Sequence, residues 1–257
     1  MLLAVDIGNT HIVIGGIEKG KISFMARIVT DRAKTEDEYA INIKTILELY
    51  KVDLNTIEGS IIASVVPPAL NSIKLAVEIL TGKKPMVVGP GVRTGINILM
   101  DNPAAVGADR VTGAVAALNE YKPPIIIIDM GTSTTVEVID RNKNYIGGMI
   151  MPGISISLSA LSNVCAQLPA ISLEPPKHIV GKNTIDSMRS GIILGTAAML
   201  DGCVERIEAE LGFEKGEATV IMTGGLGKVI SKHCHRHMNY VEELVLKGLD
   251  IIYHKNI

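Results

Sequence analysis

The chain has 257 residues, with 25 Lys and Arg against 27 Asp and Glu, a formal net charge of -2 and 47% hydrophobic residues. This composition excludes a disordered chain, which would combine low hydrophobicity with high net charge. The near-neutral charge and the lack of a long Lys/Arg block give no electrostatic footprint for nucleic acid or an acidic membrane surface. We therefore expect small-molecule partners or a second copy of the chain, and no nucleic-acid or membrane partner.

The compartment is expected to be a reducing cytoplasm. The three cysteines, Cys165, Cys203 and Cys234, lie far apart and form no CxxC pair, which excludes a disulfide framework and a four-cysteine zinc site. The first residues, MLLAVDIGNT, have no basic leader and carry an acid within the apolar stretch, so no export signal is expected. The longest apolar run, Gly191 to Leu200, has about half of the roughly 18 residues that a membrane span requires.

Short aliphatic runs closed by Gly, Asp or Pro predict strands that are buried on both faces. These runs are Met1–Val5, Ile61–Val66, Met86–Val88, Ile125–Ile128 and Thr219–Met222. Helical spacing follows in Glu36–Tyr50 and after Gly107. Strands with looser alternation flank charged turns and predict hairpins. They are His11–Ile17 with Ile22–Ile28, and Thr134–Ile139 with Tyr145–Met151. The alternation of strands and helices indicates an α/β protein.

The second half of the chain repeats the beginning of the first. LLAVDIGNT at Leu2–Thr10 aligns with IIIIDMGTS at Ile125–Ser133, an offset close to half the chain. Each copy leads into a predicted hairpin. The repeat predicts two tandem copies of one α/β unit, residues 1–118 and 119–257.

Each copy ends its first strand in Asp-x-Gly followed by polar residues, at Asp6 and at Asp129. The strand fixes the carboxylate, the glycine permits close approach of the backbone, and the polar groups that follow can donate to phosphate oxygens. A carboxylate in this position can hold a hydrated metal ion. One such loop could be a plain turn, because Asp and Gly are common turn residues. Two loops at half-chain spacing favour a triphosphate site enclosed by both copies.

Three further segments have both a functional and a structural interpretation. Thr223–Gly227, with a helix expected to start near Lys228, could approach a nucleotide or simply turn the chain. Asp109, in Gly-Ala-Asp-Arg at the start of a predicted helix, could be catalytic or could complement the helix dipole. Thr184 precedes the helical stretch 185–200, where either Asn183 or Thr184 could serve as the N-cap.

Other kinds of chemistry have little support. His233-Cys234-His235-Arg236-His237 resembles a metal site, but no second ligand cluster accompanies it, so adventitious binding is the expectation. The GxSxG elbow, GxGxxG and GxxxxGK[ST] are all absent, which removes the sequence support for a serine hydrolase, a Rossmann domain or a P-loop enzyme.

These segments together resemble the type III pantothenate kinases, members of the actin, Hsp70 and sugar kinase superfamily. The resemblance covers nearly the whole chain. It rests on DIGNTHIVIG, IIASVVPP, NPAAVGADRV, IIIIDMGTSTTVEVI, GGMIMPGI, VGKNT and MTGG. It implies two ribonuclease H-like (actin-like ATPase) domains with mixed sheets flanked by helices. It also implies ATP-dependent phosphorylation of pantothenate to 4'-phosphopantothenate, the first step of coenzyme A biosynthesis.

The resemblance assigns roles residue by residue. ATP would be bound by Asp6, Ile7, Gly8, Asn9, Thr10, His11, Ile12, Val13 and Thr132. Asp6 would also hold Mg²⁺ through water, and Asp129 would bind a monovalent cation, K⁺ or NH₄⁺. Pantothenate would be contacted by Met100, Gly107, Ala108, Asp109, Arg110 and Thr184. Asp109 would be the catalytic proton acceptor.

One position departs from the family pattern. The family usually carries an aromatic residue where this chain has Met100. A methionine can pack against the pantoyl methyl groups, but it supplies no phenol hydroxyl. We therefore expect an effect on substrate affinity rather than on the type of reaction.

The resemblance further implies a homodimer, in which the pantothenate pocket is completed at the interface and Thr184 could come from the neighbouring subunit. Two bare copies of the fold use the whole length and leave no insertion domain to cover the acceptor. Three alternatives stay open on the sequence. They are a regulatory protein like the Bvg accessory factors, another small-molecule kinase of the superfamily, and an actin-like filament protein.

Overall fold

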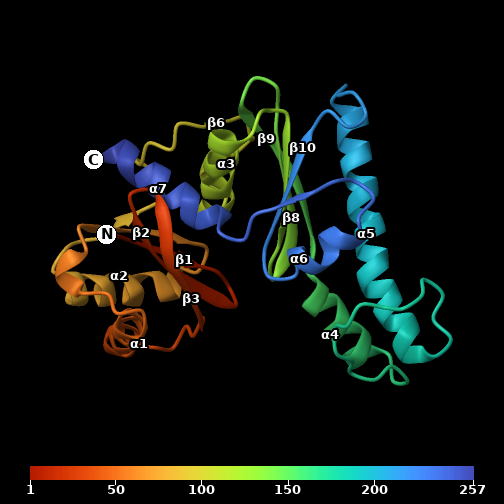
Figure 1. Cartoon of the computed structure of the whole chain (residues 1–257), viewed down its shortest axis with the longest axis horizontal. Helices are drawn as coiled ribbons and strands as arrows, with labels where there is room; N and C mark the ends of the chain where they lie inside the picture. The colour runs from red at the N-terminus through yellow and green to blue at the C-terminus, as the bar shows by residue number, and fades with distance from the viewer. The chain divides into compact units, whose positions relative to one another are not determined.

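The computed structural model describes residues 1–257 and confirms an α/β protein with two mixed sheets flanked by helices (Figure 1). The chain forms two compact units. Unit 1 consists of Met1–Ile96, Asp101–Asn119 and Glu243–Ile257. Unit 2 consists of Asn97–Met100 and Glu120–Glu242. No helix combines the length and the apolar character needed to cross a bilayer.

The sheet of unit 1 has the strand order β3-β2-β1-β4-β5. Its strands are β1 (Leu2–Ile7), β2 (His11–Glu18), β3 (Lys21–Val29), β4 (Gly59–Ser64) and β5 (Met86–Val87). Strand β2 is antiparallel to both β1 and β3, whereas β4 is parallel to β1 and β5 is parallel to β4. Strands β1, β3, β4 and β5 therefore end at the same edge of the sheet.

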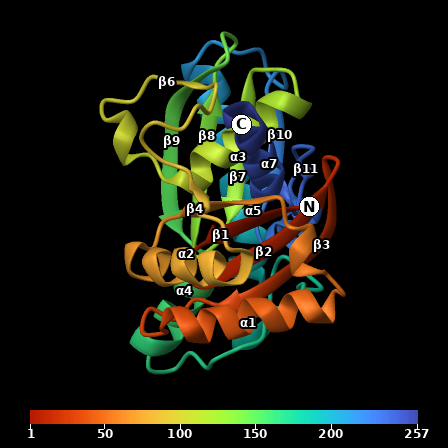
Figure 2. The ribbon, with the colours of Figure 1, turned by 90° about the vertical axis from the view of Figure 1, so that its left-hand side faces the viewer.

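Alternating residues of β1 divide unit 1 into two apolar layers. Leu3, Val5 and Ile7 pack against α1 (Glu36–Leu49) and α2 (Pro67–Thr81). Leu2 and Ala4 face the opposite layer, which contains α3 (Ala108–Glu120) and α7 (Leu244–Asn256). Figure 2 shows α1 and α2 side by side along one face of these strands. Strand β1 is covered on both faces, as its uninterrupted aliphatic sequence predicts.

Unit 2 repeats this topology with one added strand, in the order β11-β10-β7-β8-β9-β6. The strands are β6 (Asn97–Ile98), β7 (Ile125–Met130), β8 (Ser133–Ile139), β9 (Asn144–Pro152), β10 (Thr219–Thr223) and β11 (Asn239–Tyr240). The run β9-β8-β7-β10-β11 matches β3-β2-β1-β4-β5, and a register shift interrupts the hairpin near its turn in both units. The repeat read from the two Asp-x-Gly loops therefore has a structural counterpart.

The helices of unit 2 cover one face of its sheet. They are α4 (Ile154–Val164), α5 (Thr184–Glu210) and α6 (Gly227–Ile230). Helix α5 extends ten residues beyond the predicted end at Leu200, and the helix expected near Lys228 is a single turn. Short 3₁₀ turns occupy Leu54–Thr56, Pro103–Ala105 and Ser231–His233.

The compact units differ from the tandem division 1–118 and 119–257 in two places. Residues 243–257 follow the second repeat in sequence, but they form α7 on the sheet of unit 1. Residues 97–100 precede the second repeat, yet β6 pairs with β9 of unit 2. Both segments are short and have no local feature that identifies the sheet they join, so their placement depends on contacts distant in sequence.

A glycine allows the two helices on one face of unit 1 to cross closely. A Cβ atom at Gly248 of α7 would collide with the carbonyl oxygen of Thr112 in α3, whereas a Cβ at Gly113 would lie 3.6 Å from Leu244, an ordinary contact. The close crossing brings α7 down onto the sheet, where Leu246, Leu249 and Ile252 are buried.

We expect Gly248→Ala to lower the free energy of unfolding by about 1–3 kcal/mol, the usual cost of forcing extra volume into a packed core. The matched control Gly113→Ala should be neutral or stabilising by up to about 1 kcal/mol, because alanine favours the helix. Urea unfolding of both variants measures the difference. Equal stability of the two variants would contradict the close crossing.

Candidate active site

The predicted phosphate loop of unit 1 lies where the parallel strands of its sheet end. It joins β1 to β2 through Gly8, Asn9 and Thr10. The Gly8 amide donates to the carbonyl of His11 at 3.0 Å, and the Thr30 hydroxyl donates to the carbonyl of Gly8 at 2.7 Å. The Thr30 amide donates to the carbonyl of Thr10 at 3.0 Å. The backbone of the loop is thus fixed from both sides.

The residues assigned to this loop divide into exposed and buried groups. Asn9, Thr10 and His11 are exposed to solvent. Ile7 and Ile12 are buried in the core against α1 and α2, and only their backbone could contribute to binding. Asp6 and Val13 are half-buried. The loop therefore has an exposed polar tip, residues 9–11, next to the buried apolar side chains of Ile7 and Ile12.

The Gly-Ala-Asp-Arg segment lies beside this loop within unit 1. Val65, just after β4, donates its amide to the carbonyl of Ile7 at 3.1 Å. Its Cγ1 atom is also 3.3 Å from the position that a Cβ on Gly107 would occupy. Val65 thus contacts both the end of β1 and the segment that carries Asp109, and sequence reasoning did not single it out.

The carboxyl of Asp109 is set at the start of α3 against a glycine. Its Oδ1 atom is 2.5 Å from the Cβ position of Gly107 and accepts the amide of Arg110 at 2.7 Å. Burial raises the pKa of Asp109, outweighing the opposing effects of that hydrogen bond and of the Arg110 charge. A carboxylate that only complements a helix dipole is usually exposed and stabilised in its charged form. The raised pKa instead indicates a carboxyl with increased affinity for a proton.

The second predicted phosphate loop, in unit 2, has its own set of close contacts. Asp129, the second-last residue of β7, lies opposite Thr223 of β10, and the Gly131 amide donates to the carbonyl of Ser133 at 3.1 Å. A Cβ at Gly224 would lie 2.6 Å from Oδ1 of Asp129 and 2.5 Å from the carbonyl oxygen of Met130. The predicted glycine-rich loop after β10 therefore packs directly onto the predicted phosphate loop.

Two residues outside this second loop support it; Gly153 lies in the GGMIMPGI segment that carries the resemblance, whereas Tyr240 had no signal in the sequence pattern. Gly153, the N-cap of α4, approaches the carbonyl of Thr132 so closely that a Cβ there would collide with it. Tyr240, in β11, donates its hydroxyl to the carbonyl of Gly224 at 3.3 Å. Thr132 itself is exposed. Its backbone is held against Gly153.

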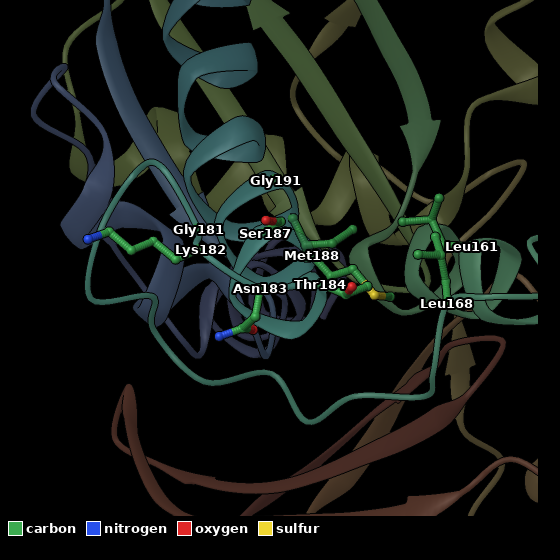
Figure 3. A pocket seen from close by; sticks show the side chains of 10 residues that line it. Leu161, Leu168, Gly181, Lys182, Asn183, Thr184, Ser187, Met188 and Gly191 are labelled. Carbon is green, nitrogen blue, oxygen red and sulfur yellow. The ribbon is translucent and has the colours of Figure 1, made fainter.

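Thr184 lines a hollow of about 680 Å³ within unit 2 (Figure 3). Figure 3 shows Leu161 and Leu168 on one side and Thr184, Ser187 and Met188 on the other. Asn183 is the N-cap of α5, since its Oδ1 accepts the amide of Asp186 at 2.9 Å. Capping is therefore done by Asn183, and the exposed hydroxyl of Thr184 is not needed for it.

Met100 also belongs to unit 2, two residues after the end of β6. Its sulfur lies 3.4 Å from the position that a Cβ on Gly147 of β9 would occupy, and its side chain is half-buried. The predicted acceptor residues are thus divided: Gly107–Arg110 in unit 1, and Met100 and Thr184 in unit 2.

The histidine-rich segment 233–237 has structural contacts. Cys234 is half-buried, donates its thiol to the carbonyl of Ile230 at 3.4 Å, and has its pKa raised to about 12 by burial. Arg236 pairs with buried Glu208 at 3.0 Å, and its amide donates to the carboxylate of Asp201. Across the chain, His, Cys, Asp and Glu side chains nowhere gather in threes around a possible metal position.

Solved structures place the fold in a class. A glucokinase of the ROK family from Streptomyces griseus, in complex with glucose and AMPPNP, matches 99% of this chain and 98% of its own, with a TM-score of 0.52 and 14% identity. A Campylobacter jejuni protein of the Baf family matches 99% and 98%, with a TM-score of 0.63 and 17% identity. These likenesses concern the fold: two mixed sheets flanked by helices, as in the actin-like ATPases and sugar kinases.

Relatives with higher sequence identity show the family. The family model for type III pantothenate kinase matches residues 2–206. Type III pantothenate kinases of Exiguobacterium sp. and Bacillus cytotoxicus are each 44% identical over 256 residues, covering 100% of this chain and 99% and 97% of theirs. The enzyme of Halalkalibacterium halodurans is 42% identical over 257 residues and is covered completely. The chain belongs to the type III pantothenate kinase family.

The raised pKa of Asp109 has a consequence for stability. Ionisation of a carboxyl whose pKa is raised by folding opposes folding at neutral pH, and this penalty disappears below the ordinary carboxyl pKa, where both states are protonated. We expect Asp109→Asn to raise the melting temperature at pH 7, and the gain to shrink as the pH falls through the raised pKa. Thermal unfolding between pH 4 and pH 7 measures it. Exposed Asp101 in the same unit provides the control, Asp101→Asn, and a similar gain in both variants would contradict the burial of Asp109.

Proposed function

We propose that the chain transfers the γ-phosphoryl group of ATP to the primary hydroxyl of pantothenate, giving 4'-phosphopantothenate, the first step of coenzyme A biosynthesis. The observation that carries this proposal is the placement of Asp109, a half-buried carboxyl of raised pKa, beside the phosphate loop of unit 1. Membership of the type III pantothenate kinase family supplies the identity of the acceptor. A reducing cytoplasm, where the substrates occur together, is the proposed compartment.

The phosphate loop holds the nucleotide through its exposed tip. Asn9, Thr10 and His11 contribute polar side chains, and the bonds of Thr30 keep the loop backbone in place without reorganisation when the ligand arrives. Phosphoryl transfer depends chiefly on alignment and charge neutralisation, so a rigid loop is the main requirement. Thr132 contributes a second exposed hydroxyl from unit 2.

Asp6 supplies a carboxylate that fits a divalent cation. It lies half-buried near the end of β1, one residue before the last, and carboxylate oxygen is the ligand that Mg²⁺ prefers. We assign Asp6 to Mg²⁺ through water. When bound with ATP, the metal neutralises phosphate charge.

Asp109 receives the proton of the acceptor hydroxyl. Its raised pKa makes the carboxylate a better proton acceptor than an exposed aspartate, and the Arg110 amide keeps one oxygen in position. In a loose transition state the hydroxyl loses its proton late, so the base need only be near and correctly oriented. Gly107, Ala108 and Arg110 form the rest of this acceptor segment.

Asp129 is proposed to bind a monovalent cation, K⁺ or NH₄⁺. Its carboxylate and the carbonyl of Met130 both lie against Gly224, where any side chain would fill the space. Carbonyl oxygens can replace the hydration shell of K⁺, and the carboxylate adds charge. This oxygen-rich position beside the second phosphate loop fits such an ion.

A homodimer is proposed as the functional state. Exposed apolar side chains occur on α4, on the start of α5 and on the segment between them: Ile156, Val164, Ile179, Val180 and Ile185. Such side chains, where they adjoin, are typical of an interaction site. Thr184 lies within this region, and we propose that it and Met100 contact pantothenate, with Thr184 reaching the substrate of the neighbouring subunit. Light scattering that gives the mass of a monomer would contradict the dimer.

The substrate is tested by ADP release with pantothenate, acetate and glucose offered separately. We expect ADP only with pantothenate. Release with acetate or glucose would identify another small-molecule kinase, and no release with any acceptor would favour a regulatory role.

We expect Asp109→Asn to reduce kcat by about 100-fold or more, the lower end of general-base effects, with ATP affinity preserved. Steady-state kinetics and direct ATP titration measure the two quantities. Near wild-type turnover in this variant would remove Asp109 from the role of base.

The cation assignment predicts that activity rises with K⁺ in a buffer free of sodium and ammonium. Asp129→Asn should abolish this response, because an amide retains the oxygen but removes the charge. A flat response of the wild-type protein to K⁺ would contradict the assignment.

A further inference from the structure

One arginine in unit 1 touches the phosphate loop without belonging to any segment assigned above. Arg32 follows β3, and β3 runs in the same direction as β1 because both are antiparallel to β2. Val29, the last residue of β3, pairs with His11, the first residue of β2. The chain after β3 therefore leaves the sheet beside the phosphate loop.

The backbone on both sides of Arg32 is fixed. Thr30 makes the two bonds to the loop described above. Tyr39 of α1, whose side chain is fully buried, donates its hydroxyl to the carbonyl of Asp31 at 2.6 Å and accepts the amide of Asp31 at 3.1 Å. The carboxylate of Asp31 accepts the amide of Ala33 at 3.0 Å. These bonds fix the point from which the Arg32 side chain leaves the backbone.

The Arg32 guanidinium reaches the tip of the loop. One of its NH₂ groups donates to Oδ1 of Asn9 at 3.1 Å, and the residue is exposed. A guanidinium carries five N–H donors in a planar fork, so this bond leaves most of the fork for a ligand. The planar fork of arginine can donate two parallel hydrogen bonds to phosphate oxygens, a geometry that lysine cannot supply.

The sheet order sets where Arg32 lies relative to the proposed base. The loop joins β1 and β2; Arg32 approaches it from the β3 side, whereas Val65 and Gly107 approach it from the β4 side. A phosphate at Asn9 would therefore meet a cation on the side of the loop away from the acceptor segment. In that place a positive charge can hold the nucleotide without obstructing the acceptor.

We propose that Arg32 binds the terminal phosphates of the nucleotide, with Asn9 orienting its guanidinium. This assignment rests on the proposed function, because it takes the loop after β1 to be the ATP phosphate loop. The competing explanation is purely structural: Arg32 would only hold Asn9 in place.

The number of phosphates on the ligand separates the two explanations. We expect Arg32→Met, which keeps the length of the side chain and removes the charge and donors, to weaken ATP binding by about tenfold or more, the effect of losing a hydrogen bond to a charged group. AMP binding should be unchanged, because AMP has no terminal phosphates. Isothermal titration of the full chain with ATP and AMP, both with Mg²⁺, measures these affinities.

Two further variants serve as controls. Lys21→Met removes an exposed positive charge at the opposite end of β3 and should leave both affinities unchanged. Arg32→Lys keeps the charge but loses the fork, and should recover only part of the ATP affinity. Thermal unfolding shows that each variant is folded.

Tyr39→Phe tests whether the two hydrogen bonds between Tyr39 and Asp31, the anchor of this segment, keep Arg32 in position. It preserves the buried ring and removes both bonds to Asp31, so ATP binding should weaken while AMP binding persists. Adding Arg32→Met to Tyr39→Phe should then cost less than Arg32→Met costs in the wild-type protein. Full additivity would show that the anchor does not act through Arg32.

The outcomes separate a failure of the proposed function from a failure of the Arg32 assignment. If the wild-type chain binds neither nucleotide, the proposed function fails and the role of Arg32 fails with it. If the wild-type chain binds ATP and Arg32→Met binds it equally well, or loses ATP and AMP by the same factor, only the assignment of Arg32 is overturned.

Discussion

Parallel pairing at the centre of each sheet is the constraint on which the rest of the molecule depends. Strand β1 pairs with β4, and β7 pairs with β10, so each Asp-x-Gly loop shares an edge with the segment that follows the neighbouring parallel strand. In unit 1 that neighbour carries Val65, which contacts Gly107. In unit 2 it carries Gly224, which contacts Asp129. Residues distant in sequence therefore meet at one edge because the strands cannot end anywhere else.

Both units place a carboxylate against a glycine. Oδ1 of Asp109 occupies the space beside Gly107, and Oδ1 of Asp129 occupies the space beside Gly224. A side chain at either glycine would displace the carboxylate, which is a stronger reason for these glycines than turn formation alone. Both carboxylates therefore lie against backbone, which moves less than side chains do, and this suits the roles proposed for them above.

The pKa values of two carboxyl groups in this chain are shifted in opposite directions by their surroundings. Glu217, on the surface of unit 2, has its pKa lowered to about 2 by its bidentate pair with Arg141. Asp109 has its pKa raised because burial outweighs its one nearby charge. The first pattern stabilises the charged form and is typical of a structural ion pair. The second leaves a carboxyl ready to take up a proton, which is the property that phosphoryl transfer to an alcohol uses.

The sequence by itself determined every strand except β6 and β11, the hairpins and the repeat, because these depend on residue periodicity over a few positions. It also located the two Asp-x-Gly loops, whose residue types carry their chemistry wherever the chain places them. Only the tertiary structure decided that residues 243–257 cover the sheet of unit 1, that β6 joins the sheet of unit 2, and that Arg236 pairs with buried Glu208. Arg32 belongs to the same group, since a single charged residue after a strand has no local signature and acquires its neighbours Asn9 and Tyr39 through folding. Local patterns specify elements, whereas the contacts that complete a site join residues far apart in sequence, where no short-range pattern can record them.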